Sequence, residues 1–235
     1  MRVFVIRHHE DDSAGFVGHA LAARGAELES RVVPDSGPLP PVEDYDGVVV
    51  LGAKWSVYDE ATIGSWIGGE IDWLRRADEA GVPVLGICFG AQVLSAALGG
   101  GVEPAPVPEI GWTTIEPVGP PVVGPGPWLQ FHGDRCVLPS DAVLHAVNDV
   151  GPQAFSLRRN LAVQFHPEVD GAQLSSWFDD GGREVAIAAG VDPDRLLAET
   201  VAEESAASGR ADDIVSTWLA RAGLGDVELG SESSR

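Results

Sequence analysis

Short apolar runs and amphipathic stretches alternate along the first hundred residues of the chain. Short apolar runs predict strands at residues 3–6, 28–33, 47–51 and 83–87, and the runs at 47–51 and 83–87 are continuous, as expected of strands buried in a parallel sheet. Apolar residues at helical spacing predict helices that include residues 16–21, 67–74 and 91–98, and glycines at 81 and 99–101 are typical of helix ends. Because crossovers between parallel strands are right-handed, this order predicts a mostly parallel sheet with helices on both faces.

The pattern changes between residues 111 and 164. Five short strand-like runs, WTTIEPV, RCVLP, AVLHAVN, QAFSL and LAVQF, are punctuated by Pro and Gly, which predicts an antiparallel extension of the same sheet. The Pro-rich residues 117–127 are expected to form a surface loop. Beyond His166 the apolar spacing predicts two helical segments, one with Leu196 and Val201 and one with Ile214 and Trp218. We expect one domain over residues 1–225 and a disordered tail at 226–235.

Composition narrows the classes of partner and compartment. The 235 residues are 44% apolar, enough for a substantial core, and carry a formal net charge of −21. That charge argues against nucleic acid or a membrane surface as a partner and favours a small ligand or another protein. With two cysteines, no long apolar leader and no run of about 18 apolar residues, the chain is expected to be cytoplasmic.

One cysteine lies on a tight corner in the stretch LGICFGAQ, residues 85–92. Gly86 and Gly90 flank Cys88 at the spacing of the nucleophile elbow, in which a strand turns sharply into a helix. The turn needs small neighbours and is expected to be strained, and the helix N-terminus favours thiolate over thiol. The other interpretation is a buried packing cysteine, which is also how we interpret Cys136.

A histidine with an adjacent carboxylate follows the last predicted strand. In VQFHPEV, extended backbone turns His166 and Glu168 to the same side, so the carboxylate can orient the ring as a general base. His19 and His145 have no such neighbour and are interpreted as structural. The chain shows no His/Cys cluster with the spacing of metal ligands, and we expect no cofactor.

The run VPVLGICFGAQVLSAALGG, followed by VQFHPEV, resembles the class I glutamine amidotransferase family, and the similarity covers roughly residues 3–169. The sequence most resembles stand-alone members related to the glutaminase domain of GMP synthase. LGAKWSVYDE, EIGW (109–112), QFHGD (130–134) and QAFSL (153–157) match signatures of that group. The expected fold is α/β and flavodoxin-like, with a mostly parallel central sheet flanked by helices and an antiparallel extension.

The resemblance implies a role for nine residues. It makes Cys88 the nucleophile, His166 the general base and acid, and Glu168 the group that orients His166. Backbone N–H groups of Phe89 and Ala53 would form the oxyanion hole. Substrate contacts are implied for Gln92, Gly52, His132 and Gly133.

The chain departs from the family pattern at one place. Where the family commonly has Gly-Gly-Pro, this chain has Gly52, Ala53 and Lys54. If the second glycine must adopt a positive φ to aim its N–H, alanine costs energy there. Lys54, the only lysine, is either a ligand contact or a solvated loop residue.

The implied reaction is hydrolysis of the glutamine side-chain amide through a cysteinyl thioester, with ammonia released for an acceptor on a partner. The chain has no GxxxxGK[ST] motif, so an ATP-using synthetase partner would activate that acceptor. One alternative is a stand-alone γ-glutamyl peptide or amide hydrolase. Another is a catalytically silent binding subunit. The related cysteine-peptidase and chaperone group lacks the downstream HPE and fits less well.

Overall fold

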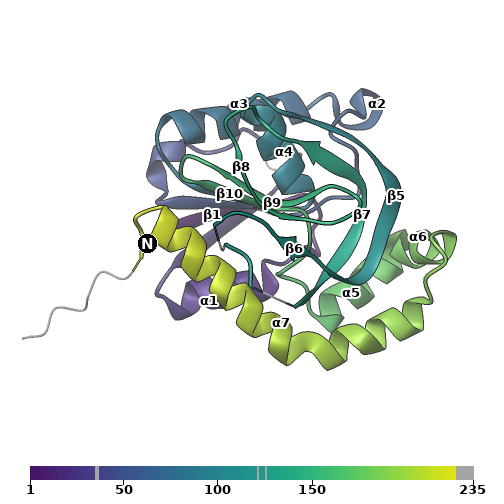
Figure 1. Ribbon diagram of the computed structural model, residues 1–235. Coiled ribbons are helices and arrows are strands. Elements are labelled where there is room, and N and C mark those ends of the chain that lie inside the picture. Colours follow the sequence, from purple (N-terminus) through teal and green to yellow (C-terminus); the bar gives the residue numbers. More distant parts are fainter. Residues whose placement is uncertain (35–36, 121, 125, 226–235) are drawn as a thin grey trace, which may run out of the picture.

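A central sheet with helices on both faces organises the molecule (Figure 1). The computed structural model describes residues 1–34, 37–120, 122–124 and 126–225. The eight strands of this sheet lie in the order β2 (Glu27–Val32), β1 (Arg2–Arg7), β3 (Gly47–Val50), β4 (Val84–Ile87), β10 (Asn160–Val163), β9 (Pro152–Leu157), β8 (Val143–Val147), β6 (Glu116–Pro117). The first five are parallel and the last three are added antiparallel, which confirms the predicted fold class.

Alternation along the strands builds one core on each face of the sheet. On β1, Val3 and Val5 pack with α1 (Gly15–Ala23) and the C-terminal half of α7 (Pro193–Arg221). Phe4 and Ile6 point the other way and pack with α3 (Ile67–Glu79) and α4 (Phe89–Ala97). Figure 1 shows α3 and α4 on one side of the sheet and α1 and α7 on the other.

The antiparallel extension is only partly as predicted. Strands β8 and β9 join the central sheet, but β5 (Gly101–Thr114) and β7 (Pro127–Val137) form a separate two-stranded ribbon. The expectation that all the runs extend one sheet is therefore wrong. Prolines at 104, 106 and 108 lack the N–H that a central strand needs, and the β5–β7 register shifts between Pro104 and Glu109.

The prediction of two helical segments near the C-terminus is also wrong, because α7 is a single helix of 29 residues. Its N-terminus is capped by the Asp192 side chain, which accepts from the N–H groups of Asp194 and Arg195. The polar stretch at 202–210 is part of the continuous helix, in which Ala207 is buried and Gly209 is exposed. A mid-helix glycine costs only about 1 kcal/mol, which packing of both ends offsets.

Several short elements were not predicted: η1 (Val42–Asp44), α2 (Glu60–Ile63), α5 (Gly171–Trp177), the kinked segment η2 (Phe178–Gly182) and α6 (Arg183–Ala188). The Pro-rich stretch is not wholly at the surface, because Val122 and Val123 are buried against the core on the α1–α7 face. The tail at 226–235 lies outside the described residues. No helix in the described part is long and apolar enough to cross a membrane.

Candidate active site

The carboxyl ends of neighbouring parallel strands meet at one edge of the sheet. His8 directly follows β1, and Cys88 directly follows β4. Gly52 is the second residue after β3, and His166 is the third residue after β10. These strands are adjacent in the order β1, β3, β4, β10, so the four residues gather at the edge where open α/β sheets bind ligands.

Cys88 lies on the strained corner that the sequence predicts. Its φ and ψ are 52° and −109°, a region that side-chain-bearing residues rarely adopt, and it is the N-cap of α4. The flanking glycines are required by close approach. A Cβ on Gly86 would lie 2.7 Å from the Gly90 carbonyl oxygen, and a Cβ on Gly90 would lie 2.1 Å from the Val50 carbonyl oxygen.

His166 and Glu168 form a buried pair in the predicted geometry. His166 Nδ1 lies 2.8 Å from Glu168 Oε1, and the backbone N–H of His166 donates to the Leu129 carbonyl at 2.8 Å. In the described part of the chain, His166 Nε2 has no hydrogen-bond partner. Trp177 of α5 packs against the ring, with ring centroids 4.8 Å apart. One ring nitrogen is thus held while the other stays open for chemistry.

The charge of the His166 ring depends on its two neighbours. Burial alone would lower the pKa of His166, but the Glu168 carboxylate and the Cys88 sulfur raise it to about 10. The raised pKa favours the protonated ring at neutral pH. A protonated imidazole beside a sulfur is suited to stabilise a thiolate and to give a proton to a leaving amine.

Gly52 lies where Cys88 and His166 come together. A Cβ added to Gly52 would be 3.0 Å from Cε1 of His166 and 3.8 Å from Cβ of Cys88. Any side chain at this position would therefore press on the histidine ring. The neighbouring Ala53 has no positive φ, so alanine in place of the family's second glycine carries no conformational cost here.

Two backbone N–H groups lie unpaired at this corner. Phe89 is the first residue of α4, so no carbonyl one helical turn earlier can accept its N–H. The Ala53 N–H has no hydrogen bond within the residues that the structure describes. Both N–H groups belong to residues next to Gly52 and Cys88 and are free to bind a ligand.

The predicted substrate residues Gln92 and His132 are buried among other polar groups. Gln92 Nε2 donates to the Asp134 carbonyl and to Gln164 Oε1, each at 3.3 Å. His132 Nδ1 lies 2.9 Å from the Asp134 carbonyl and Nε2 lies 3.0 Å from Gln130 Oε1. Gly133 is exposed. Substrate contact by these residues and Gly52 stays a prediction.

Three of the sequence signatures meet in one buried network. Gln130 of QFHGD donates to Gln153 Oε1 of QAFSL at 2.8 Å, and Gln153 Nε2 donates to Glu109 Oε2 of EIGW at 3.0 Å. Glu109 Oε2 also lies 3.3 Å from His132 Nε2. These signatures therefore tie the β5–β7 ribbon to the central sheet, a role that the sequence alone did not reveal.

The loop after β3 is anchored at both of its ends. Ser56 Oγ and Tyr58 Oη donate to the Asp134 carboxylate at 2.5 and 2.6 Å. Lys54 Nζ donates to Asp180 Oδ2 of η2 at 2.8 Å, with both side chains about half exposed. Lys54 thus forms an ion pair and stays more than half exposed on the loop, and its contact with a ligand stays a prediction.

Three residues near the site were missed by sequence reasoning: Trp177 packs on His166, His8 contacts Gly52 and Phe89, and Glu70 contacts His8. The signal for His8 was its place directly after a strand that pairs with β3. The signal for Glu70 was a carboxylate on the apolar face of a helix, three residues after Ile67 and four before Leu74. Trp177 gave no such signal, because its helix was not predicted.

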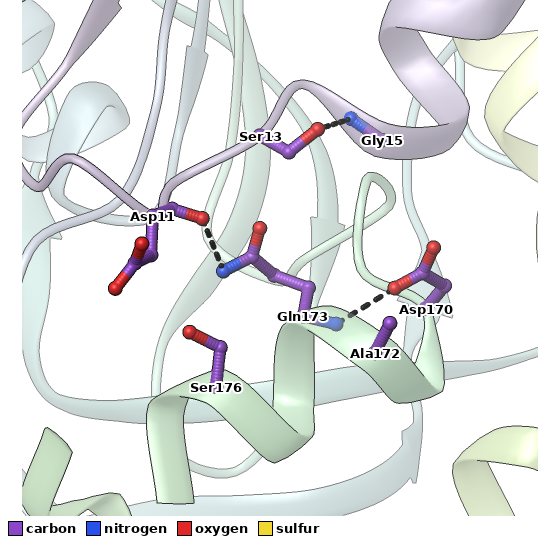
Figure 2. A pocket seen from close by; sticks show the side chains of 7 residues that line it. All are labelled: Asp11, Ser13, Gly15, Asp170, Ala172, Gln173 and Ser176. Atoms are coloured by element: carbon purple, nitrogen blue, oxygen red, sulfur yellow. Dashed lines mark hydrogen bonds between the residues drawn. The ribbon is translucent and has the colours of Figure 1, made fainter. Parts of the chain in front are cut away.

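A hollow of about 360 Å³ is lined by residues that include Asp11, Gly15 and Gln173 (Figure 2). Its walls come from the loop after β1 and from α5, where Gln173 Nε2 donates to the Asp11 carbonyl at 3.1 Å and Asp170 caps the helix. None of the nine predicted site residues lines it. In the described ranges, no group of three or more His, Cys, Asp or Glu could hold a metal ion.

Comparison with known families agrees with this geometry. The model of the family "Glutamine amidotransferase class-I" matches residues 12–181. The chain therefore belongs to the class-I glutamine amidotransferase family. A glutamine amidotransferase structure from Thermotoga maritima matches 93% of this chain and 98% of its own, with a TM-score of 0.84 and 26% identity.

Two curated relatives differ in what they act on. A glutamine-hydrolyzing GMP synthase of Desulfotalea psychrophila is 34% identical over 164 residues, which cover 64% of this chain and 30% of the relative. A γ-glutamyl-L-1-hydroxyisopropylamide hydrolase of a Pseudomonas species is 28% identical over 169 residues, which cover 63% of this chain and 56% of the relative. The matched part thus spans well under two thirds of either relative.

Proposed function

We propose that Cys88, His166 and Glu168 form a catalytic triad that hydrolyses the side-chain amide of glutamine. The observation that carries this proposal is that Gly52 lies between Cys88 and His166, so that a Cβ added to it would be within 3.8 Å of both, at a corner where the backbone of Cys88 is strained. Strain of this kind presents a nucleophile above the sheet edge. The Glu168 carboxylate at 2.8 Å fixes the ring, which leaves Nε2 for proton transfer.

The reaction proceeds in two halves. The Cys88 thiolate attacks the δ-amide carbon, and a C–S bond forms as the carbonyl oxygen becomes an oxyanion. The His166 imidazolium gives its proton to the leaving nitrogen, the C–N bond breaks, and ammonia departs. Neutral His166 then takes a proton from water, which attacks the thioester. Glutamate leaves, and the Cys88 thiolate and the imidazolium are restored.

The oxyanion is held by the N–H groups of Phe89 and Ala53. Neither N–H has a hydrogen-bond partner among the residues that the structure describes, and each such donor is worth roughly 3 kcal/mol of barrier. The ordinary φ of Ala53 supports its assignment despite the departure from Gly-Gly-Pro. Gln92, Gly52, His132 and Gly133 would contact the glutamyl part of the substrate.

The released ammonia would pass to an acceptor on a partner that uses ATP. The similarity to part of a glutamine-hydrolyzing GMP synthase supports this version, since that protein couples the two activities in its name. A second candidate is hydrolysis of a γ-glutamyl amide by this chain alone, which the Pseudomonas hydrolase favours. Only the leaving amine differs, so the same triad serves both. The preserved Cys88, His166 and Glu168 argue against a silent binding subunit.

The test is an assay of the purified protein with glutamine and with γ-glutamyl amides, with Cys88→Ser as the inactive control. Ammonia release from glutamine supports the glutaminase, and turnover of γ-glutamyl amides alone supports the hydrolase. A covalent γ-glutamyl adduct on Cys88, detected by mass spectrometry of acid-quenched samples, supports the thioester. Turnover that survives in Cys88→Ser contradicts the proposal.

A further inference from the structure

A second buried histidine–carboxylate pair lies behind the candidate active site. His8 Nε2 lies 3.3 and 3.2 Å from the two carboxylate oxygens of Glu70, and Nδ1 lies 3.0 Å from the carbonyl oxygen of Gly52. The side chains are 1% and 0% exposed. Nothing in the proposed reaction uses this pair, although it contacts a residue at the centre of the site.

The partners of His8 determine its charge. A backbone carbonyl can only accept a hydrogen bond, and an ionised carboxylate can only accept one. With Glu70 ionised, both ring nitrogens donate, and the ring is an imidazolium. Burial lowers the pKa of His8, but the Glu70 carboxylate and the Gly52 carbonyl outweigh burial, and the net shift is upward.

The hydrogen bond between His8 and the Gly52 carbonyl oxygen also fixes the direction of the Ala53 N–H. The Gly52 carbonyl and the Ala53 N–H belong to the same peptide unit, which is trans, so they point in opposite directions in one plane. A hydrogen bond that holds the carbonyl on the His8 side therefore turns the Ala53 N–H away from His8. This N–H is free of hydrogen bonds in the part of the chain that the structure describes.

The His8 ring also touches the other candidate oxyanion residue. Its ring meets that of Phe89 edge-on, with centroids 4.9 Å apart, and Trp66 lies on another side at 5.8 Å. His8 thus contacts a residue on each side of the oxyanion position. Its own place is fixed by Glu70 of α3 and by backbone contacts of the loop after β1, where Asp12 Oδ2 accepts from the His8 N–H at 3.2 Å.

We propose that His8, held by Glu70, is a positioning residue that orients and polarises the Gly52–Ala53 peptide so that the Ala53 N–H is a preformed oxyanion donor. The inference rests on the proposed function and adds to it a part that touches no substrate atom. A cation bound to a carbonyl draws electron density through the peptide and makes its N–H a stronger donor. A donor aimed before the reaction costs no reorganisation during it.

The first test separates oxyanion stabilisation from nucleophilicity. His8→Leu removes the donor to Gly52, whereas His8→Asn puts an amide N–H near the position of Nδ1 without the charge. We expect kcat for glutamine or a γ-glutamyl amide to fall about 10- to 100-fold in His8→Leu and less in His8→Asn, with little change in KM. This is below the 10²–10³ that loss of a whole donor costs.

Alkylation by iodoacetamide provides the matched readout, because this displacement forms no oxyanion. Labelling of Cys88, followed by peptide mass spectrometry, should proceed at the wild-type rate in both variants. His145→Asn, another buried histidine with both ring nitrogens engaged, serves as the control with unchanged kcat. Equal kcat in His8→Leu and wild type overturns the inference. A parallel loss of alkylation overturns it too, since the effect would then be general distortion.

A second measurement tests the role of His8 without any enzymatic turnover. In Cys88→Ser protein labelled with ¹⁵N, the two ring nitrogens of His8 should both be protonated at pH 7.5, and the Ala53 amide resonance should move in His8→Leu. A neutral His8 ring, or an unmoved Ala53 amide, overturns the inference even in an active enzyme. A wild-type protein that hydrolyses neither substrate class contradicts the proposed function alone, because these resonances still report on His8.

Discussion

Two buried histidine–carboxylate pairs lie at the same edge of the sheet, and they differ in one ring nitrogen. In the first, His166 gives Nδ1 to Glu168 and keeps Nε2 without a partner in the described part of the chain. In the second, His8 gives Nε2 to Glu70 and Nδ1 to the Gly52 carbonyl. The pKa of each histidine is raised, by Glu168 and Cys88 in one case and by Glu70 and Gly52 in the other.

The difference shows that a shifted pKa in a site does not identify a proton-transfer group. A histidine can transfer a proton to substrate only through a nitrogen that no protein group occupies. His166 meets that condition and His8 does not. In the reaction that we propose, the two pairs divide these tasks, with proton transfer by His166 on one side of Gly52 and orientation of the Gly52–Ala53 peptide by His8 on the other.

The largest loss of activity should come from replacing His166, which removes its unpartnered Nε2. His166→Asn should lower kcat/KM about 10⁴-fold or more, because the base and acid are lost together. Steady-state assays of ammonia release or γ-glutamyl amide cleavage measure this loss. His145→Asn is the matched buried-histidine control and should change activity little. A loss under tenfold in His166→Asn would make the two pairs equivalent and contradict their division of roles.

Removal of the Glu70 carboxylate should lower the free energy of unfolding as well as the activity. Glu70→Ala leaves the His8 ring buried without its carboxylate, and breaking a buried pair in this way costs about 3–5 kcal/mol of unfolding free energy. Urea denaturation measures the change. Asp72→Ala on the same helix removes a carboxylate whose side chain is 62% exposed and should change stability by about 0.5 kcal/mol or less. Equal effects of the two variants would contradict this prediction.

Gly52→Ala should disturb the point where the two pairs meet. The added Cβ would lie 3.0 Å from Cε1 of His166, so the ring must shift by a few tenths of an ångström. Displacements of catalytic groups by about 1 Å can cost 10²-fold, and we expect a loss of kcat of up to about that size. Stopped assays on the variant measure it, with its melting temperature as the check on folding. Unchanged kcat would show that the ring tolerates the shift.

The pH dependence of stability should report the charge of the His166 ring. The measurement uses Cys88→Ser, in which the Glu168 carboxylate raises the pKa of His166 without a contribution from the Cys88 sulfur. Folded protein then binds the ring proton more tightly than the unfolded chain, whose pKa is about 6.5. The contribution is complete below pH 6.5 and is lost as pH rises through the folded pKa, with a slope of at most about 1.4 kcal/mol per pH unit.

Urea unfolding of Cys88→Ser between pH 6 and pH 9 measures this slope. The double variant Cys88→Ser, Glu168→Gln should lose most of it, since the carboxylate that holds the proton is gone. The His8 pair contributes equally to both proteins and cancels in the difference. Identical slopes in the two proteins would mean that the His166 ring is neutral when folded.

The elements that could be predicted from the sequence are those specified by short local patterns. The four parallel strands, the corner at Cys88 and the His166–Glu168 spacing all follow from local patterns over a few residues. The β5–β7 ribbon and the single helix α7 did not, because prolines in a strand and a glycine within a helix are tolerated only through long-range packing. His8 and Glu70 are 62 residues apart, so nothing local links them.

The smallest effect should come from restoring the family's glycine at position 53. Ala53 has no positive φ, so glycine relieves no strain there and only adds freedom to the unfolded chain, which should cost about 0.4–1 kcal/mol of stability. Because the His8 contact to the Gly52 carbonyl holds the peptide plane, the N–H should stay aimed and kcat should change by less than about threefold. In the His8→Leu background the same Ala53→Gly change should reduce kcat further, since the plane then has no anchor. Parallel kinetics of the single and double variants measure this coupling; additive losses would mean that His8 and the Ala53 peptide act independently.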